Sequence, residues 1–324
     1  MGEGLEDRAI TRDIDWGVPV PLPEAAGKVL YVWFDAPIGY ISATVEWARS
    51  LGTPERWKDY WLDPQTKVVH FIGKDNIVFH ALVWPAMLMG QPEAYNLPYQ
   101  IPANEFLNLE GMKISTSRNW AVWAEDVVRD FQVDALRYYL TANAPEAKDA
   151  DFSFEEMATR VNSELADIFG NFVNRALAFA RNYLGAEVPR AGALQSADDQ
   201  ILNLAASQLD AEAAHIESYE MRAALAAALE IARAANKYYN DAEPWTWRKK
   251  DPRRAETVLN VACRVAASLA TAFEPFTPVA AGEIRRMLGM TRPLSWEGAK
   301  TPVIPEGAPL GTIKVLIEKI DDGK

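Results

Sequence analysis

Two stretches with different hydrophobic periodicity limit the folds open to this chain of 324 residues. Over the first 110 residues, apolar runs rich in β-branched and aromatic residues alternate with helical patterns at 42–50 and 76–89. The apolar runs are KVLYVWF (28–34), KVVHFIG (67–73) and YQIPANEFLNL (99–109). Strands interleaved with helices predict parallel β-α-β units, and therefore part of a doubly wound, Rossmann-like parallel sheet.

A different pattern begins at Phe154, where apolar residues start to recur every three or four positions up to Tyr183. This spacing predicts an amphipathic helix, and similar patterns predict helices at 219–240 and 253–273. Ser196, followed three residues later by Asp199, is typical of a helix N-cap. The predicted fold class is therefore α/β plus all-α, a partial doubly wound sheet followed by an α-helical bundle. The tail from Pro293 ends in IKVLI (313–317), which we expect to pack back as an extended arm.

Composition limits the cellular compartment and the binding partners expected for this chain. The single cysteine, Cys263, excludes disulfides and a cysteine zinc site built from this chain, and its alanine- and valine-rich surroundings predict a buried core residue. No apolar run approaches the ~20 residues needed to span a bilayer, and no leader precedes the polar start, so we expect a cytoplasmic protein without membrane contact. The net charge of −12 disfavours non-specific nucleic-acid binding. The run from Arg248 to Arg254 nevertheless carries +4, which suits a local RNA contact.

Two motifs in the first region suit small ligands. YVWFDAPIGY (31–40) forms a predicted strand-to-helix turn, and His80 and Trp84 share one face of the following helix. Aromatic and imidazole edges suit a thioether, because sulfur makes favourable contacts with aromatic rings; the alternative is an aromatic core cluster. The stretch from Gly73 to Asp75 lies between a predicted strand and helix, where backbone N–H groups bind ribose or phosphate oxygens. The alternative there is a helix cap by Asp75.

Two further motifs carry cations. The loop GMKISTSRN (111–119) is rich in hydroxyl and basic side chains, and its alternative interpretation is a solvated turn. In the bundle, Asn171 and Arg175 are four residues apart, and Trp245 precedes the basic run. Bases of an exposed RNA loop are read by stacking and by hydrogen bonds to their edges, with cations nearby. The alternatives are a solvated face and a packed tryptophan.

In this order, the segments 31–40, 70–85 and 111–119 resemble the second half of a methionyl-tRNA synthetase catalytic domain. The helices that follow resemble the anticodon-binding bundle of that family. The resemblance runs from about Gly4 to Asp322 and implies four groups of site residues. The methionine-binding group is Trp33, Ala36, Pro37, Tyr40, Ile77, His80 and Trp84, and the ATP-binding group is Gly73, Lys74, Asp75, Lys113 and Thr116. The catalytic group is Lys113, Ser115, Thr116, Ser117 and Arg118, and the anticodon-binding group is Asn171, Arg175 and Trp245.

The sequence departs from the family pattern in three places. Residues 113–117 read KISTS where the family usually reads KMSKS, so Thr116 replaces the second lysine. That lysine donates positive charge as pyrophosphate leaves, and our hypothesis is that Arg118 supplies it instead. We find neither a His-Ile-Gly-His signature nor a zinc knuckle in the sequence. We therefore expect the C-terminal part of such an enzyme, with no zinc site.

The resemblance implies the following domains: residues 1–119 as the C-terminal half of the catalytic domain, 120–150 as a connecting stem-contact region, 151–292 as the anticodon-binding bundle, and 293–324 as an extended arm. It implies a methionine-tRNA ligase that uses methionine, ATP with Mg²⁺ and a tRNA with a CAU anticodon, and that needs an N-terminal half polypeptide. One alternative is a non-catalytic paralogue that binds the tRNA anticodon. Another is a class I synthetase for a different large apolar amino acid.

Overall fold

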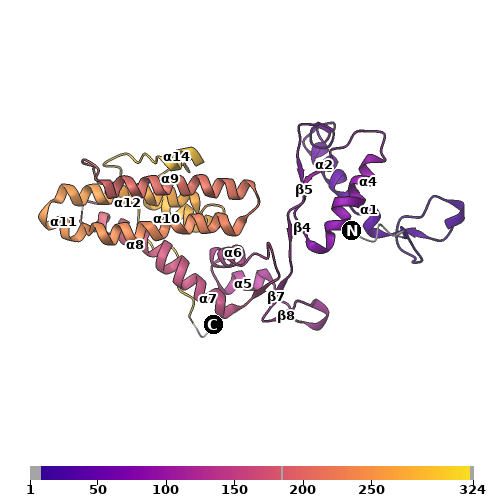
Figure 1. Ribbon diagram of the computed structural model, residues 1–324, viewed down its shortest axis with the longest axis horizontal. Helices are drawn as coiled ribbons and strands as arrows, with labels where there is room; N and C mark the ends of the chain where they lie inside the picture. The colour runs from indigo at the N-terminus through magenta and orange to yellow at the C-terminus, as the bar shows by residue number, and fades with distance from the viewer. Residues whose placement is uncertain (1–8, 184, 322–324) are drawn as a thin grey trace. The chain divides into compact units, whose positions relative to one another are not determined.

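The computed structural model describes residues 9–183 and 185–321, and it divides into two compact units, Met1–Asn104 and Glu105–Lys324. The loop at 111–119 thus belongs to the second unit. Figure 1 labels the elements of both units. Within the described residues, no helix is both long enough and apolar enough to cross a membrane.

The first unit contains short parallel strand pairs surrounded by helices. Strand β3 (Val68–Val69) pairs in parallel with β5 (Pro98–Gln100), and β4 (Ile72–Gly73) pairs in parallel with β6 (Ala103–Asn104). The parallel β-α-β arrangement predicted for this region is confirmed. Its helices are α1 (Val32–Asp35), α2 (Ile38–Ser50), α3 (Lys58–Trp61), α4 (Trp84–Met89) and the 3-10 turn η1 (Pro23–Ala25).

The run KVLYVWF departs from its prediction. Only Val29–Leu30 is extended, as β2, and it pairs antiparallel with β1 (Thr11–Arg12) instead of joining a parallel sheet. Residues 32–35 form α1, and Ala36 and Pro37 also have helical backbone angles, so the chain is helical almost continuously into α2. Proline is well tolerated in a first helical turn, and local helix closure here outweighs the strand preference of Val32 and Phe34.

The helix predicted at 76–89 forms in three geometries. A 3-10 turn, η2 (Lys74–Asn76), is followed by the π-helical segment η3 (Phe79–Val83) and then by α4. Pro85 lies near the start of α4 and has no N–H to donate to the preceding turn. A wider turn just before it accommodates the missing bond, which accounts for the π geometry.

The second unit begins with a three-stranded sheet and ends in a helical bundle. Strand β7 (Leu107–Leu109) lies between β8 (Met112–Lys113), which is antiparallel to it, and β9 (Ala150–Phe152), which is parallel to it. One unbroken helical path then covers residues 154–183 as α7 (Phe154–Arg160), the π-helical segment η5 (Val161–Gly170) and α8 (Asn171–Tyr183). The remaining helices are α5 (Ala124–Asp130), α6 (Val133–Ala142), α9 (Ser196–Glu217), α10 (Met221–Ala242), α11 (Pro244–Lys250), α12 (Pro252–Ala272), α13 (Pro278–Met287) and α14 (Trp296–Lys300).

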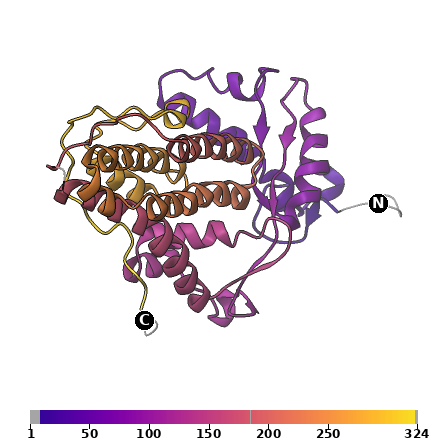
Figure 2. The same ribbon diagram turned by 60° about the vertical axis from the view of Figure 1, so that its left-hand side comes forward.

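Figures 1 and 2 both show α10 and α12 running alongside α9. Helix α12 lies at the centre of the bundle, because nearly all its side chains from Ala255 to Ala272 are buried. Cys263 is among them, as predicted, and burial raises the pKa of its thiol to about 12. Together with the parallel pairs of the first unit, this bundle confirms the predicted fold class.

Two details of the bundle can be compared with their predictions. The N-cap of α9 is Gln195 and not Ser196, because Gln195 forms a capping box with Asp198. Asp198 is completely buried and its carboxylate accepts the Gln195 N–H, so the buried acid fixes the helix start one residue early. In the tail, Leu316 and Ile317 are buried against the bundle as expected, although the short helix α14 interrupts the arm.

Candidate functional site

A small aromatic cavity of about 140 Å³ lies in the first unit. It forms where the turn between α1 and α2 meets the π-helical segment η3. Its lining residues are Trp33, Ala36, Pro37, Gly39, Tyr40, Phe79 and His80. Five of these belong to the group that the sequence predicted for methionine, and two, Gly39 and Phe79, do not.

Hydrogen bonds hold the imidazole of His80 in one orientation. His80 Nδ1 lies 3.1 Å from the Asn76 carbonyl oxygen, and His80 Nε2 lies 3.0 Å from the Tyr40 hydroxyl. Since a carbonyl oxygen only accepts, Nδ1 carries the proton and Nε2 accepts from the tyrosine. The two rings are therefore fixed to each other, with their centroids 5.9 Å apart. A ligand in the cavity meets a wall that is already ordered.

The wall behind these rings contains one residue that sequence reasoning missed. The His70 ring is buried, 5.2 Å from Tyr40 and 5.2 Å from His80. Burial, and next the neighbouring His80, lower the pKa of His70, so its neutral form is favoured. His70 is the first residue after β3, and its place at a strand end was the signal available in the sequence.

Two other predicted members of the methionine group lie at different depths. Trp84 is 1 % exposed, and its ring centroid lies 6.3 Å from that of Tyr40, so it supports the cavity from behind. Its indole Nε1 has no hydrogen-bond partner among the described residues. Ile77 is 42 % exposed and does not line the cavity.

The Gly73–Asp75 stretch leads from β4 into the short turn η2. Gly73 is the N-cap of that turn, and no side chain caps it, so Asp75 does not act as a helix cap. A Cβ atom at position 73 would lie only 2.9 Å from Asp75 Oδ1. A side chain at position 73 would therefore have to displace the Asp75 carboxylate, which is the end of a flexible side chain and can move.

The loop at 111–119 is a hairpin with exposed cations. Glu110 and Gly111 have positive φ angles of 47° and 74°, as a two-residue turn between paired strands requires. Ser115 and Trp120 exchange two backbone hydrogen bonds of 2.8 and 2.9 Å, which closes the loop around the turn η4 (Thr116–Arg118). The side chains of Lys113, Thr116, Ser117 and Arg118 are exposed at its surface.

The polar contacts of the loop side chains are few. Ser115 Oγ lies 3.2 Å from Ser117 Oγ, and Lys113 Nζ lies 5.5 Å from the Phe106 ring centroid. Neither Lys113 nor Arg118 has an ion pair within residues 9–183 and 185–321. Both cations therefore remain available to an anion.

The base of the loop is tied to the start of the long helical path. The Gly111 N–H donates to the Asp151 carboxylate at 2.8 Å, and the Phe154 N–H donates to Glu110 Oε1 at 3.0 Å. The Trp120 indole donates to the Leu109 carbonyl at 3.0 Å. Three bonds thus fix the loop base to β9, α7 and β7, although the loop side chains are exposed.

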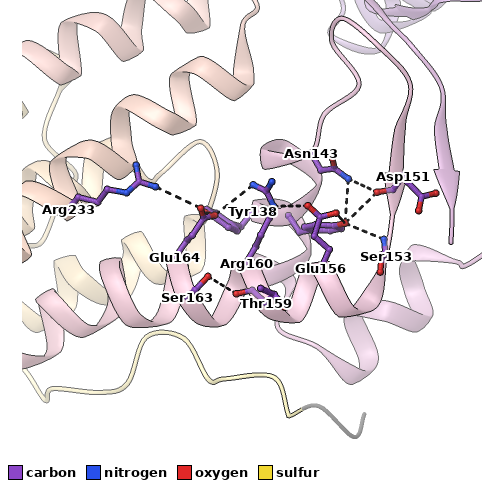
Figure 3. A network of polar contacts seen from close by, with 11 residues as sticks. Tyr138, Asn143, Asp151, Ser153, Glu156, Thr159, Arg160, Ser163, Glu164 and Arg233 are labelled. Atoms are coloured by element: carbon purple, nitrogen blue, oxygen red, sulfur yellow. Dashed lines mark hydrogen bonds and ion pairs between the residues drawn. The ribbon is translucent and has the colours of Figure 1, made fainter. Parts of the chain in front are cut away.

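From that base a polar network continues along the helix (Figure 3). The Tyr139 hydroxyl accepts the Ser153 N–H and donates to Glu156, and burial raises its pKa to about 12. Glu156 binds Arg160 at 2.9 Å, and Glu164 lies 3.9 Å from Arg160.

The network ends on α10. Glu164 accepts a 2.6 Å hydrogen bond from the Tyr138 hydroxyl and lies 3.8 Å from the Arg233 guanidinium (Figure 3). Burial, and next the bond to Glu164, raise the pKa of Tyr138, so its hydroxyl stays a donor. The helix that starts at the loop base is thereby tied to α10.

A second functional candidate lies in the bundle, where α8, α10 and α11 meet. The Arg175 side chain donates to Asn240 Oδ1 at 3.0 Å, and its Cζ lies 5.3 Å from the Tyr239 ring and 5.9 Å from the Trp245 ring. Trp245 is 38 % exposed, and its ring centroid lies 5.9 Å from that of Tyr239. Two of the three residues predicted to read an anticodon therefore form one cluster.

The third predicted residue, Asn171, is the first residue of α8 and is exposed. It lies one helical turn before Arg175, so both side chains project from neighbouring positions of the helix. Sequence reasoning missed Tyr239 and Asn240, which hold Arg175 in place. They lie at the end of an alanine-rich helical pattern that only indicated packing.

Family models and curated relatives both indicate the same protein family. A family model described as tRNA synthetases class I (M) matches residues 1–177, and one described as the anticodon binding domain of methionyl tRNA ligase matches residues 188–324. Methionine-tRNA ligase of Porphyromonas gingivalis is 48% identical over 322 residues, and that of Parabacteroides distasonis is 50% identical over 323 residues. Each alignment covers 98% of this chain and 46% of the relative, so the chain spans about half the length of these relatives.

The solved structures agree with this. Methionyl-tRNA synthetase of Mycobacterium tuberculosis bound by methionyl-adenylate is similar with a TM-score of 0.85 and 31% identity, covering 98% of this chain and 61% of that one. The apo form of the same enzyme is similar with a TM-score of 0.82 and 31% identity, covering 99% of this chain and 62% of that one.

Proposed function

The chain belongs to the class I tRNA synthetases of the methionine type, and from this premise we propose that it carries the methionine pocket, the signature loop and the anticodon reader of a methionine-tRNA ligase. In that reaction the methionine carboxylate attacks the α-phosphate of ATP, and the bond to the β-phosphate breaks to release pyrophosphate. The methionyl group then passes to the 3′-terminal adenosine of the tRNA. The substrates are methionine, ATP as its Mg²⁺ complex and a tRNA with a CAU anticodon. We also propose that the reaction takes place in the cytoplasm.

The observation that carries the proposal is the ordered aromatic cavity. A methionine side chain is flexible and apolar, and it needs shape and polarisable contacts more than hydrogen bonds. The cavity offers Trp33, Tyr40, Phe79 and His80 as walls, and the Tyr40–His80 bond fixes two of them. A site whose walls are fixed beforehand loses less conformational entropy when it binds.

For the nucleotide, the Gly73–Asp75 turn of the first unit and the signature loop of the second unit each offer groups that suit ATP. Lys113 and Arg118 are exposed cations without carboxylate partners in the described parts of the chain, so they suit the developing charge on pyrophosphate. In this proposal Arg118 covers for Thr116, and Ser115 and Ser117 order the loop.

Anticodon reading is the second part of the proposal. Arg175 and Trp245 offer a guanidinium and a half-exposed indole side by side, which is the combination that stacks and hydrogen-bonds an unpaired base. Asn171 adds amide groups one turn away. A non-catalytic RNA-binding module would use this cluster alone, without the cavity and the loop.

The deciding experiment measures methionine-dependent ATP–pyrophosphate exchange and binding of a CAU stem-loop RNA on the same sample. We expect CAU-dependent binding by this chain. Because its sequence contains no His-Ile-Gly-His signature, we expect little exchange until a polypeptide with the N-terminal half of a relative is added. Binding with no exchange even after complementation would favour the non-catalytic module. Loss of CAU preference would refute anticodon reading.

A further inference from the structure

Tyr183 and Arg248 form a second arginine-aromatic pair on the same two helices as Arg175 and Trp245. Arg248 Cζ lies 4.2 Å from the centroid of the Tyr183 ring. In the first pair the arginine comes from α8 and the ring from α11, and in the second pair these origins are exchanged. The two pairs therefore repeat one type of contact along the line where α8 and α11 face each other.

The second pair is exposed, and its cation is not neutralised. Tyr183 is 49 % exposed, and Arg248 is exposed as well. The guanidinium of Arg248 has neither an ion pair nor a hydrogen bond within the described residues. Arg254, by contrast, is buried and paired with the carboxylate of Asp198. Of these two arginines in the basic run, one is structural and the other is available to a ligand.

The chemistry of this pair suits a phosphate. A guanidinium that lies over a ring uses its face for that contact and keeps its N–H donors at the edge, where they match phosphate oxygens. Lys249 and Lys250 follow in the last turn of α11 and are exposed. Cations in a last turn also interact favourably with the helix dipole. This explains the presence of the two lysines but not the position of Arg248 over a ring. On a chain with a net charge of −12, this cluster is a local positive surface.

We propose that Arg248, oriented by Tyr183, binds a backbone phosphate of the anticodon loop outside the bases read by Arg175 and Trp245. Along α8, Tyr183 lies eight residues after Arg175, or about 12 Å, and along α11, Arg248 lies three residues after Trp245, or about 4.5 Å. Both spacings exceed the ~3.4 Å between stacked nucleotides, so the second pair contacts a different nucleotide. The inference rests on the proposed anticodon function and extends it to a contact that is independent of sequence.

The test measures binding of two stem-loop RNAs, one with a CAU triplet and one with a changed triplet, to the full chain over a range of salt concentrations. Arg248→Gln should weaken the binding of both RNAs equally, by about two- to fivefold. It should also reduce the magnitude of the slope of log affinity against log salt by about 0.7. Tyr183→Ala should weaken binding in the same sense, and Tyr183→Phe should retain wild-type binding because the ring remains. Trp245→Ala should instead remove the preference for CAU.

Arg292→Gln is the matched control, because Arg292 is exposed and its substitution by glutamine removes the same charge. Arg292 lies between α13 and Trp296. The Trp296 indole donates to the Leu209 carbonyl, and Leu209 lies far along α9 from Asp198, the partner of Arg254. Equal effects of Arg248→Gln and Arg292→Gln would overturn the phosphate contact and leave anticodon reading intact if Trp245→Ala still removes the CAU preference. A wild-type chain that binds neither RNA would overturn both proposals.

Discussion

A buried carboxyl group without a partner should make the stability of the bundle depend on pH. Glu212 lies on α9 and is 0 % exposed, and neither of its carboxyl oxygens has a hydrogen-bond partner among the described residues. Helix α9 packs against α10, α12 and α14, which together exclude water from this position. Burial raises the pKa of Glu212 from an ordinary value of 4.5 to about 9.

The sign of the effect follows from this shift. The folded-state pKa lies above the unfolded value, so the contribution of Glu212 is complete below pH 4.5 and is lost as pH rises toward about 9. Between pH 5.5 and 7.5 the folded protein keeps the proton and the unfolded chain has released it. Each unit of rising pH then lowers the free energy of unfolding by about 1.36 kcal/mol, which gives a loss of about 2.7 kcal/mol over the two units.

Glu212→Gln replaces the protonated acid by a neutral side chain of the same shape and removes this dependence. We expect the variant to gain about 2.7 kcal/mol over the wild type between pH 5.5 and 7.5, measured by urea unfolding followed by circular dichroism. Glu217→Gln, at an exposed position of the same helix, is the control and should change stability by less than about 0.5 kcal/mol at either pH. A stability difference for Glu212→Gln that stays constant with pH would show that the native carboxyl is ionised and would refute the reasoning.

Three further predictions concern the bundle, the cavity and the loop. Asp198→Ala should destabilise the bundle by about 3–5 kcal/mol in urea unfolding, because it leaves the buried Arg254 without its carboxylate; a loss below 1 kcal/mol would contradict this. Tyr40→Phe should weaken methionine binding about three- to tenfold in titration calorimetry, because His80 Nε2 loses its donor; unchanged affinity would separate the cavity from methionine. Arg118→Ala should slow pyrophosphate exchange by about 10²-fold in the complemented enzyme, and adding Thr116→Lys should restore part of it; unchanged exchange would refute the role of Arg118.

Long periodic segments made the bundle predictable from the sequence. Residues 154–183 repeat apolar side chains over several turns, and these side chains are buried against α6 in α7 and against α10 and α12 further along. The short strands were not predictable in their limits, since pairs of two or three residues depend on a partner elsewhere in the chain. At Val32 strand preference lost to helix closure. The π geometry of η3 and η5 has no clear pattern in hydrophobic spacing.

The site shows the same division between local and distant information. Tyr40 and His80 were placed in one pocket by resemblance, and the structure brings them within 3.0 Å. His70 joins them because β3 ends beside the cavity, which depends on strand pairing that the sequence does not encode locally. Asn240 likewise meets Arg175 only through the packing of α10 on α8, 65 residues apart in the chain.

The cluster in the bundle and the signature loop differ in how far their side chains are fixed before a ligand arrives. Arg175 is held by Asn240 and lies over Tyr239 and Trp245, so an RNA base meets a platform whose rotamers are already chosen. The loop has a fixed base, through Gly111 and Glu110, but Lys113 and Arg118 extend from it without carboxylate partners in the described chain. Ordering a long cationic side chain costs up to about 2 kcal/mol of rotamer entropy. The triphosphate must supply that free energy as it binds. Loop substitutions should therefore alter nucleotide steps and leave RNA affinity unchanged.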